Sequence, residues 1–400
     1  MAKRINSTPK ADGYRMPGEF EPQERIFMIW PERPDNWRNG GKPAQKTYVN
    51  IAKAISEFTP VTMLVSPGQY ANARSRLPEY VRCVEMVNDD AWMRDCGPSY
   101  VIDRKGGIRA VDWKFNAWGG LYDGLYFPWA NDDALAQKVC ELDDIDTYRP
   151  DFVLEGGSIT VDGEGTLITT EMCLLSPGRN PDKNKEEIEK YVSDYLNLDK
   201  VIWIKDGMDP DETNGHVDDV ACFVKPGEVI CIWTDDVDNP WYKVAHDAYD
   251  TLVNATDANG RKLKVHKLTL LKNPVTFKGG EEEIDAIEGT MPRVEGDPCV
   301  PSYMNFLITN DGIICPQFGD PYDELAIKQL QEIFPDKKVV GVRTEEVIYG
   351  GGNIHCITQQ KPKATVSKNL TDEDLNKVAG GEDPIDIDHF NTWEVIPTIE

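Results

Sequence analysis

The chain has 400 residues, a hydrophobic share of 40% and a formal net charge of −26 at pH 7. This length suits one large domain or two to three ordinary ones. The acidic balance argues against nucleic acid as a partner, because proteins that bind phosphates need a basic face, and it favours a cationic ligand only weakly.

Pairs of apolar segments joined by a glycine turn recur along the chain and predict β-hairpins. They lie at 99–113, 158–170, 220–233 and 302–318. Their spacing of roughly 60 to 80 residues suits a repeated supersecondary unit. Amphipathic helices are expected between them, at 45–58, 133–142, 184–197 and 321–334. Flanking strands are expected at 25–30, 61–65, 200–204 and 337–342. Strands alternating with helices indicate an α/β domain.

The stretch beyond about Gln360 has a different composition: it is polar and acidic and is interrupted by glycine and proline. We therefore predict a single domain over residues 1–363 and a loosely held acidic C-terminal tail over 364–400.

Membrane and secretion signals are absent from the sequence. No apolar run approaches the roughly 20 residues that a bilayer-spanning helix needs, and no apolar stretch follows the basic start. The nine cysteines show no CxxC pair, so we expect free, mostly structural thiols in a reducing compartment. The sequence thus predicts a cytoplasmic protein.

Three polar clusters lie at the edges of the hairpins, at the same place in each repeated unit. AWMRDCGPS carries Trp92 and Asp95, FVLEGGS carries Glu155, and DETNGHVDDVACF carries His216 and Asp218. If the units surround a common axis, these edges converge on one point.

His216 and Asp218 are two residues apart in a segment that we expect to be extended. Their side chains would then share a face while Asp219 points away. A carboxylate beside a histidine raises the imidazolium population and can orient the ring. A strand-end ion pair or a turn cap explains this pair equally well.

A fourth cluster, YGGGNIHCITQQ, spans 349–360. Its glycines, including Gly351 and Gly352, would let the backbone approach a ligand closely. Cys356 follows them and could act as a nucleophile if nearby groups favour its thiolate. His355 would face the other way in an extended segment, so we do not assign it as the base. A buried structural cysteine is the alternative for Cys356.

A metal centre is another interpretation, with His216, Asp218, Glu155 and Asp95 as candidate ligands to zinc or iron. The chain has five histidines, no HExxH motif and no paired histidine spacing, so we expect no metal. It also lacks a GxSxG elbow, a GxxxxGK[ST] phosphate loop and a dinucleotide fingerprint.

Together, six segments resemble the agmatine deiminases of the guanidine-modifying superfamily, from about Pro17 to Lys363. In chain order they are NDDAWMRDCGPS, FVLEGGS, ITTEMCLLSPGRNP, ETNGHVDDVACF, EGTMPR and YGGGNIHCITQQ. The resemblance implies the pentein fold, a five-bladed α/β propeller of pseudo-fivefold ββαβ units around a central site. That expectation agrees with the repeats.

The resemblance also implies roles for individual residues. Cys356 matches the nucleophile and His216 the general acid and base. Asp95, Glu155 and Asp218 match the carboxylates around a guanidinium. The implied reaction converts agmatine and water to N-carbamoylputrescine and ammonia through a covalent amidino-thioether on Cys356, with no metal or organic cofactor.

Substrate contacts are less specific. Acidic and aromatic surroundings suit an amine, so we expect Trp92 and Glu212 to contact the substrate chain, although core packing is an equal alternative for Trp92. Arg94 is expected in a structural ion pair. Related enzymes are often homo-oligomers, so we expect one here.

Four other interpretations of the protein remain open. Three are enzymes: a peptidyl- or methyl-arginine deiminase, an amidinotransferase and a metal-dependent hydrolase. The fourth is an acidic binding or scaffold protein without enzymatic activity.

Overall fold

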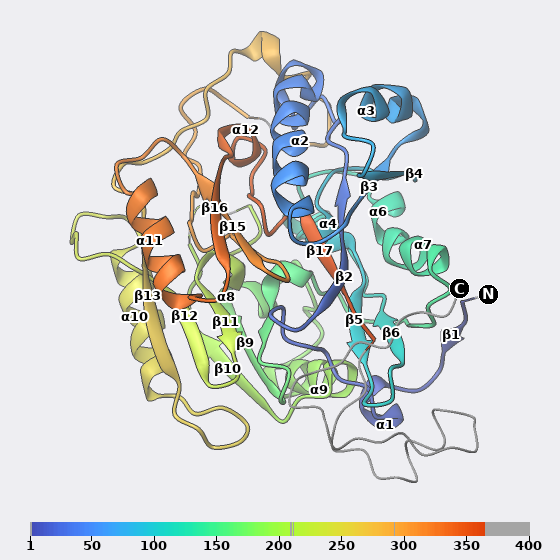
Figure 1. Cartoon of the computed structure of the whole chain (residues 1–400), viewed down its shortest axis with the longest axis vertical. Helices are drawn as coiled ribbons and strands as arrows, with labels where there is room; N and C mark the ends of the chain where they lie inside the picture. Colours follow the sequence, from blue (N-terminus) through green and yellow to red (C-terminus); the bar gives the residue numbers. More distant parts are fainter. Residues whose placement is uncertain (1, 209, 211, 292, 365–400) are drawn as a thin grey trace.

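The computed structural model describes residues 2–208, 210, 212–291 and 293–364. Within them the chain forms small mixed sheets with helices packed between and outside them, in an α/β fold (Figure 1). All four predicted hairpins are present as antiparallel strand pairs. Apart from Ala364, the predicted tail lies outside the described residues.

Five sheets in this part of the chain share one strand order: an antiparallel pair, a helical connection, and a third strand parallel to the second. Four of them follow the sequence directly. Their strands are β5 (Ser99–Ile102), β6 (Ile108–Val111) and β7 (Thr147–Tyr148); β8 (Thr160–Val161), β9 (Thr166–Thr170) and β10 (Lys200–Ile204); β11 (Ala221–Lys225), β12 (Glu228–Trp233) and β13 (Lys264–Thr269); β14 (Leu307–Ile308), β15 (Gly312–Gln317) and β16 (Lys338–Arg343). β1 (Arg4–Ile5) extends the first of these sheets beside β7.

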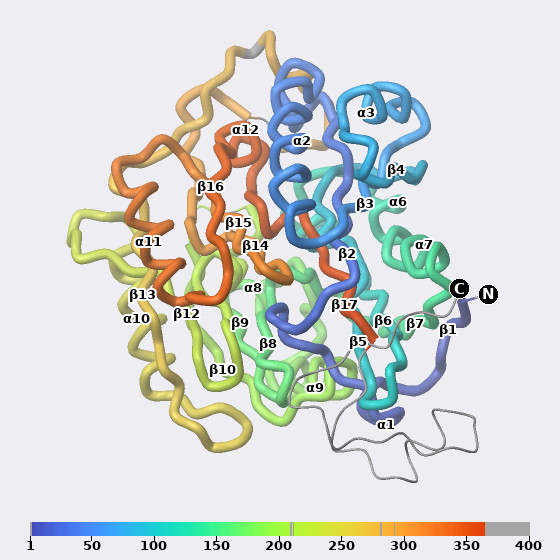
Figure 2. The backbone as a smooth tube through the Cα atoms, in the orientation of Figure 1, coloured from blue at the N-terminus to red at the C-terminus, as the bar shows by residue number. Residues whose placement is uncertain are grey.

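The remaining sheet joins the two ends of the described chain. Here β17 (Thr358–Pro362) pairs antiparallel with β2 (Gln23–Ile29), and Figure 2 shows the two segments running side by side. β3 (Val61–Val65) and β4 (Arg82–Glu85) complete it in parallel. Its hairpin-like pair therefore has no connecting turn, which is why the glycine pattern did not reveal it.

Helices connect the second and third strands of each unit. The main ones are α2 (Lys42–Ser56), α7 (Leu135–Leu142), α9 (Lys185–Leu196), α10 (Tyr242–Asn254) and α11 (Asp323–Ile333). Asn184 begins α9 with a reciprocal capping box to Glu187. Shorter helices are α1 (Pro9–Asp12), α3 (Tyr70–Arg76), α4 (Met93–Cys96), α5 (Gly120–Asp123), α6 (Ala130–Asp133), α8 (Glu171–Leu174) and α12 (Glu345–Ile348), with 3₁₀ turns at Arg38–Gly41, Pro67–Gln69, Gly156–Ser158, Val217–Asp219 and Glu281–Glu283.

Buried apolar side chains fill the space between sheets and helices; Ile26, Met63, Leu167, Ile230 and Ile314 are fully buried. No helix among the described residues has both the length and the apolar character to cross a membrane. The repeated unit matters most for the segment just before its first strand, because that segment carries the candidate site residues.

Candidate active site

The segments just before the first strands converge, as the sequence predicts. A β-carbon built on Gly157 would lie 2.5 Å from His216 Nδ1, 2.9 Å from Asp95 Oδ1 and 3.0 Å from Asp218 Oδ2. Three side chains from two units therefore meet at a backbone position of a third unit, and only glycine leaves room for them.

The local structure at His216 corrects one expectation. Val217–Asp219 forms a 3₁₀ turn rather than an extended strand, so the alternation argument for His216 and Asp218 was wrong. Asp219 does not point away: its Oδ1 accepts a hydrogen bond from Asn305 Nδ2 at 3.1 Å, and Asn305 contacts the candidate nucleophile.

Cys356 lies in a turn over residues 354–357, just before β17. Its Sγ lies 3.6 Å from Asp218 Oδ2 and accepts a hydrogen bond from Asn305 Nδ2 at 3.1 Å. The side chain is 6% exposed. Burial raises the pKa of the Cys356 thiol well above its usual value, and Asp218, Asp219 and Asp95 raise it further. The thiol is therefore protonated while the site holds no cationic substrate.

His216 and Glu155 form the second half of the site. His216 Nε2 lies 3.6 Å from Glu155 Oε2, and Arg179 Nε donates to Glu155 Oε1 at 2.9 Å. Burial alone would lower the pKa of His216, but Asp95, Cys173 and Glu155 outweigh it and raise the pKa well above its usual value. Burial would raise the pKa of Glu155, yet Arg179 and His216 hold it below its usual value. Together these shifts favour an imidazolium beside a carboxylate.

Asp95 links the two halves. Its Oδ1 accepts from Gly157 N at 2.9 Å and its Oδ2 from Trp118 Nε1 at 2.9 Å. His216 Nδ1 lies 3.9 Å from Asp95 Oδ1. Burial raises the pKa of Asp95 to about 6; Asp218 and Glu155 add to the shift and His216 opposes it.

His355 does not occupy an extended segment, which corrects the argument used to set it aside. Its Nδ1 contacts Asp218 Oδ2 at 2.8 Å and its Nε2 contacts Glu19 Oε1 at 2.9 Å. The ring therefore orients Asp218 instead of facing away from the site. Arg94, as expected, forms a structural ion pair: Nη1 lies 2.9 Å from Glu19 Oε1, with the Arg94 side chain 1% exposed.

An open pocket leads to this floor. The residues that line it include Asp95, Cys356, Trp92, Glu212 and Gly351. Trp92 is 5% exposed and stacks on Trp37 with ring centroids 5.3 Å apart, so it serves both core and pocket. A β-carbon on Gly352 would lie 2.6 Å from the Trp92 ring and 3.1 Å from Cys356 Sγ. Gly351 has φ +106° and lies against Glu212, where a side chain would clash.

Glu212 carries a partner that the sequence did not suggest. Its two carboxylate oxygens accept from Arg293 Nη1 and Nη2 at 2.8 Å each, and Arg293 also donates to Gly350 O at 2.6 Å. Glu212 therefore reaches the pocket with its charge already paired to a guanidinium.

Several residues of the site were not predicted from the sequence. Asn305 lies just before β14, which is the position that carries a polar side chain in the other units, and its place in the repeat could have revealed it. Asp90 accepts from Trp37 Nε1 at 2.7 Å and from Trp92 Nε1 at 2.9 Å, and so fixes the aromatic wall. Trp118 and Arg179 were also missed.

Two of the four candidate metal ligands, Glu155 and His216, lie together with Cys173, which was not among the candidates. Glu155, His216 and Cys173 each offer a donor atom, and these atoms lie within 4.8 Å of one another. Asp95 and Asp218 instead face Gly157 on the other side of the imidazole.

Known proteins resemble this chain over most of its length. The model of the Porphyromonas-type peptidyl-arginine deiminase family matches residues 15–362. A curated protein of Lactococcus lactis assigned as an agmatine deiminase is 66% identical over 366 residues, which is 91% of this chain and all of that protein. The solved agmatine deiminase of Enterococcus faecalis is 64% identical, covers 91% of this chain and 100% of its own, and superposes with a TM-score of 0.89.

A more distant solved structure, an agmatine deiminase of C. jejuni, has 24% identity and a TM-score of 0.75 over 88% of this chain and 97% of its own, and so shares the fold. The model match and the close relatives each span nearly the whole described chain, including every segment that meets at Gly157. The chain therefore belongs to the agmatine deiminase family of hydrolases, within the Porphyromonas-type peptidyl-arginine deiminases.

Proposed function

We propose that this protein converts agmatine and water to N-carbamoylputrescine and ammonia through a covalent amidino-thioether on Cys356. The observation that carries the proposal is the position of Cys356 Sγ, 3.6 Å from Asp218 Oδ2, in a floor where Asp95 and His216 also meet. A thiol, two carboxylates and an imidazolium are the groups that substitution at a guanidinium carbon requires.

Binding of the substrate changes the charge at the thiol. Asp95 and Asp218 accept N–H donors of the planar guanidinium and hold its carbon near Cys356 Sγ. The added positive charge offsets the carboxylates that keep the thiol pKa high, so the thiol loses its proton in the complex. The substrate thus helps to activate its own nucleophile.

Two half-reactions follow. The Cys356 thiolate adds to the guanidinium carbon, His216 donates its proton to a terminal nitrogen, and ammonia leaves from the tetrahedral adduct. The neutral His216 then takes a proton from water, and the hydroxide adds to the amidino carbon. The hydroxyl proton of this second adduct passes through solvent to the ammonia, which becomes ammonium, and the C–S bond breaks to release the ureido product and the thiolate. Glu155, between Arg179 and His216, stabilises the imidazolium before each turnover.

The pocket favours a substrate with a cationic tail. Its lining contains four carboxylates, Asp35, Asp90, Asp95 and Glu212, and two guanidinium groups, Arg33 and Arg293. Both arginines are already paired, Arg33 with Asp35 at 2.8 Å and Arg293 with Glu212. Among the described residues of the lining, an α-carboxylate would therefore meet only cations that are already paired. The ammonium of agmatine would meet aromatic groups and the Asp90 carboxylate, which accepts from the neutral N–H groups of Trp37 and Trp92.

Mass spectrometry tests the covalent step. After the protein is mixed with agmatine and quenched with acid, an amidino mass gain should appear on the peptide that contains Cys356. Incubation with agmatine, arginine and an arginyl peptide should give ureido product from agmatine. Absence of agmatine turnover, or preference for the peptide, would reject agmatine as the substrate.

The proposal also includes the propeller architecture, the single domain, the cellular location and the oligomeric state. The five sheets with a common ββαβ order support a five-bladed propeller built from a single catalytic domain over residues 1–363. A cytoplasmic location and a homo-oligomeric state are proposed from the sequence and its family, and size-exclusion chromatography with light scattering tests the second.

A further inference from the structure

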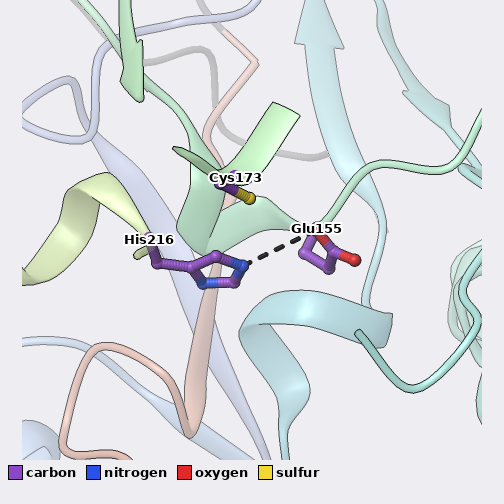
Figure 3. Close-up of side chains that lie close together, drawn as sticks. All are labelled: Glu155, Cys173 and His216. Atoms are coloured by element: carbon purple, nitrogen blue, oxygen red, sulfur yellow. Dashed lines mark ion pairs between the residues drawn. The ribbon is translucent and has the colours of Figure 1, made fainter. Parts of the chain in front are cut away.

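Glu155, Cys173 and His216 form a compact cluster (Figure 3). Glu155 precedes the 3₁₀ turn Gly156–Ser158, Cys173 lies in α8, and His216 begins the turn before β11. All three side chains are essentially buried, with exposed fractions of 0%, 0% and 1%. Cys173 takes no part in the proposed reaction.

The donor atoms suit a thiophilic divalent cation. Thiolate, imidazole and carboxylate are the ligands of zinc in proteins, and three protein ligands leave a fourth tetrahedral position for water. Glu155 Oε2 and His216 Nε2 are 3.6 Å apart. Two ligands at zinc bonding distance in a tetrahedron lie about 3.4 Å apart, so this pair needs little movement.

The surroundings both support and oppose a cation. Asp95 Oδ1 lies 3.9 Å from Nδ1 of His216, the side of the ring opposite the cluster, where a carboxylate would orient a metal-bound imidazole. Arg179 holds Oε1 of Glu155 and leaves Oε2 turned toward His216, as the dashed line in Figure 3 shows. Its positive charge disfavours a metal ion, while Asp95 and Asp218 favour one.

We propose that this cluster is an inhibitory site for a thiophilic divalent cation of the Zn²⁺ type. The cation bonds to Cys173 Sγ, His216 Nε2 and Glu155 Oε2, and the thiol and imidazolium protons leave to solvent. It reaches the cluster past Asp95, which lines the pocket. Because the metal takes the lone pair of His216, proton transfer to the leaving nitrogen stops. The inhibitory consequence, though not the binding, depends on the role proposed for His216.

A Co²⁺ titration of the Cys356→Ser protein tests binding without turnover. With the nucleophilic thiol removed and metals stripped by chelator, a thiolate-to-Co²⁺ charge-transfer band should still appear. It should vanish when Cys173→Ser is added and persist when Cys83→Ser is added, since Cys83 lies in β4 away from the cluster. No band in the Cys356→Ser protein would overturn the site even if Cys173→Ser failed to fold.

Inhibition provides a second arm. Cys173→Ser should need at least about tenfold more Zn²⁺ than the unmodified protein for half-inhibition, and Cys83→Ser should need the same amount. Equal sensitivity of Cys173→Ser would overturn the proposal and place the metal at Cys356. A Co²⁺ band in a protein that does not turn over agmatine would support the metal site while rejecting the proposed function.

Discussion

The two halves of the active site differ in how their charges are balanced. Around His216, the carboxylate of Glu155 has Arg179 at 2.9 Å, and the imidazolium has Asp95 and Glu155 nearby. Around Cys356, the charges that act most strongly on the thiol are those of Asp218, Asp219 and Asp95, all negative. In the proposed mechanism, the acid–base half is therefore complete before substrate binds, whereas the nucleophile half is completed by a cation that the substrate brings.

Removing the nucleophile should have the largest effect and leave binding intact. Cys356→Ser replaces a thiol by a much weaker nucleophile, so kcat should fall at least about 10⁴-fold, as for other catalytic nucleophiles. The carboxylates remain, and agmatine should still bind, as isothermal titration calorimetry can measure. Cys83→Ser serves as the control and should retain full activity; retained turnover in Cys356→Ser would refute covalent catalysis.

The ion pair between Arg179 and Glu155 in the His216 half should contribute to the free energy of unfolding. Arg179 and Glu155 are both 0% exposed, and Arg179 also donates to Thr213 O at 2.7 Å. Arg179→Met leaves the Glu155 carboxylate buried without its cation, so the free energy of unfolding should fall by about 3–5 kcal/mol. Urea denaturation measures it.

The matched control is an exposed ion pair. Lys190 and Asp194 pair along α9 with Lys190 74% exposed, so Lys190→Met should leave the unfolding midpoint unchanged. If Arg179→Met and Lys190→Met lost the same free energy of unfolding, the buried ion pair would matter no more to stability than the exposed one, and this prediction would be wrong.

The excess negative charge around Cys356 should be visible in the pH dependence of its reactivity with an alkylating agent. With the thiol pKa raised above its usual value near 9.0, the thiolate fraction of the empty site grows about tenfold per pH unit from pH 7 to 9. Alkylation of Cys356 by iodoacetamide, followed on its peptide by mass spectrometry, should rise about 100-fold over that range without reaching a plateau. A plateau below pH 8 would show a preformed thiolate and remove the need for the substrate's charge.

The same division explains what the sequence could predict. The four contiguous hairpins were predicted because apolar strands and a glycine turn are local features. The fifth pair, β2 with β17, combines residues more than 300 positions apart in the chain, and no local pattern records it. Helix α10 was not predicted because its buried side consists mainly of the small residues Ala245 and Ala248, which give a weak apolar pattern.

Within the candidate site, the residues assigned to the proposed reaction could be singled out from motifs, but their partners could not. Asp95, Glu155, His216 and Cys356 each lie before the first strand of a unit, a position visible in the sequence. Arg179, which balances Glu155, lies between α8 and α9, in the connection between the second and third strands of its unit. The 3₁₀ turn at Val217–Asp219 also defeated the expectation of an extended segment, because two successive aspartates beside a valine suit a turn as well as a strand end.

Trp118 offers the finest test of the comparison, because it acts through Asp95, the residue shared by both halves. Its indole N–H donates to Asp95 Oδ2 at 2.9 Å, which favours the ionised carboxylate. Trp118→Phe removes a hydrogen bond to a charged group, so kcat/KM should fall about tenfold or somewhat more. Since the pKa of Asp95 is about 6, kcat/KM should decline as pH falls through 6, and in Trp118→Phe this decline should begin at higher pH.

Trp113→Phe is the matched control for that shift. Trp113 is also buried, and its indole donates to Ser99 Oγ at 3.0 Å, outside the site. Its loss should reduce stability without moving the acid limb of the pH profile. If both variants moved the limb alike, or neither did, Asp95 would not be the group whose ionisation limits activity at low pH.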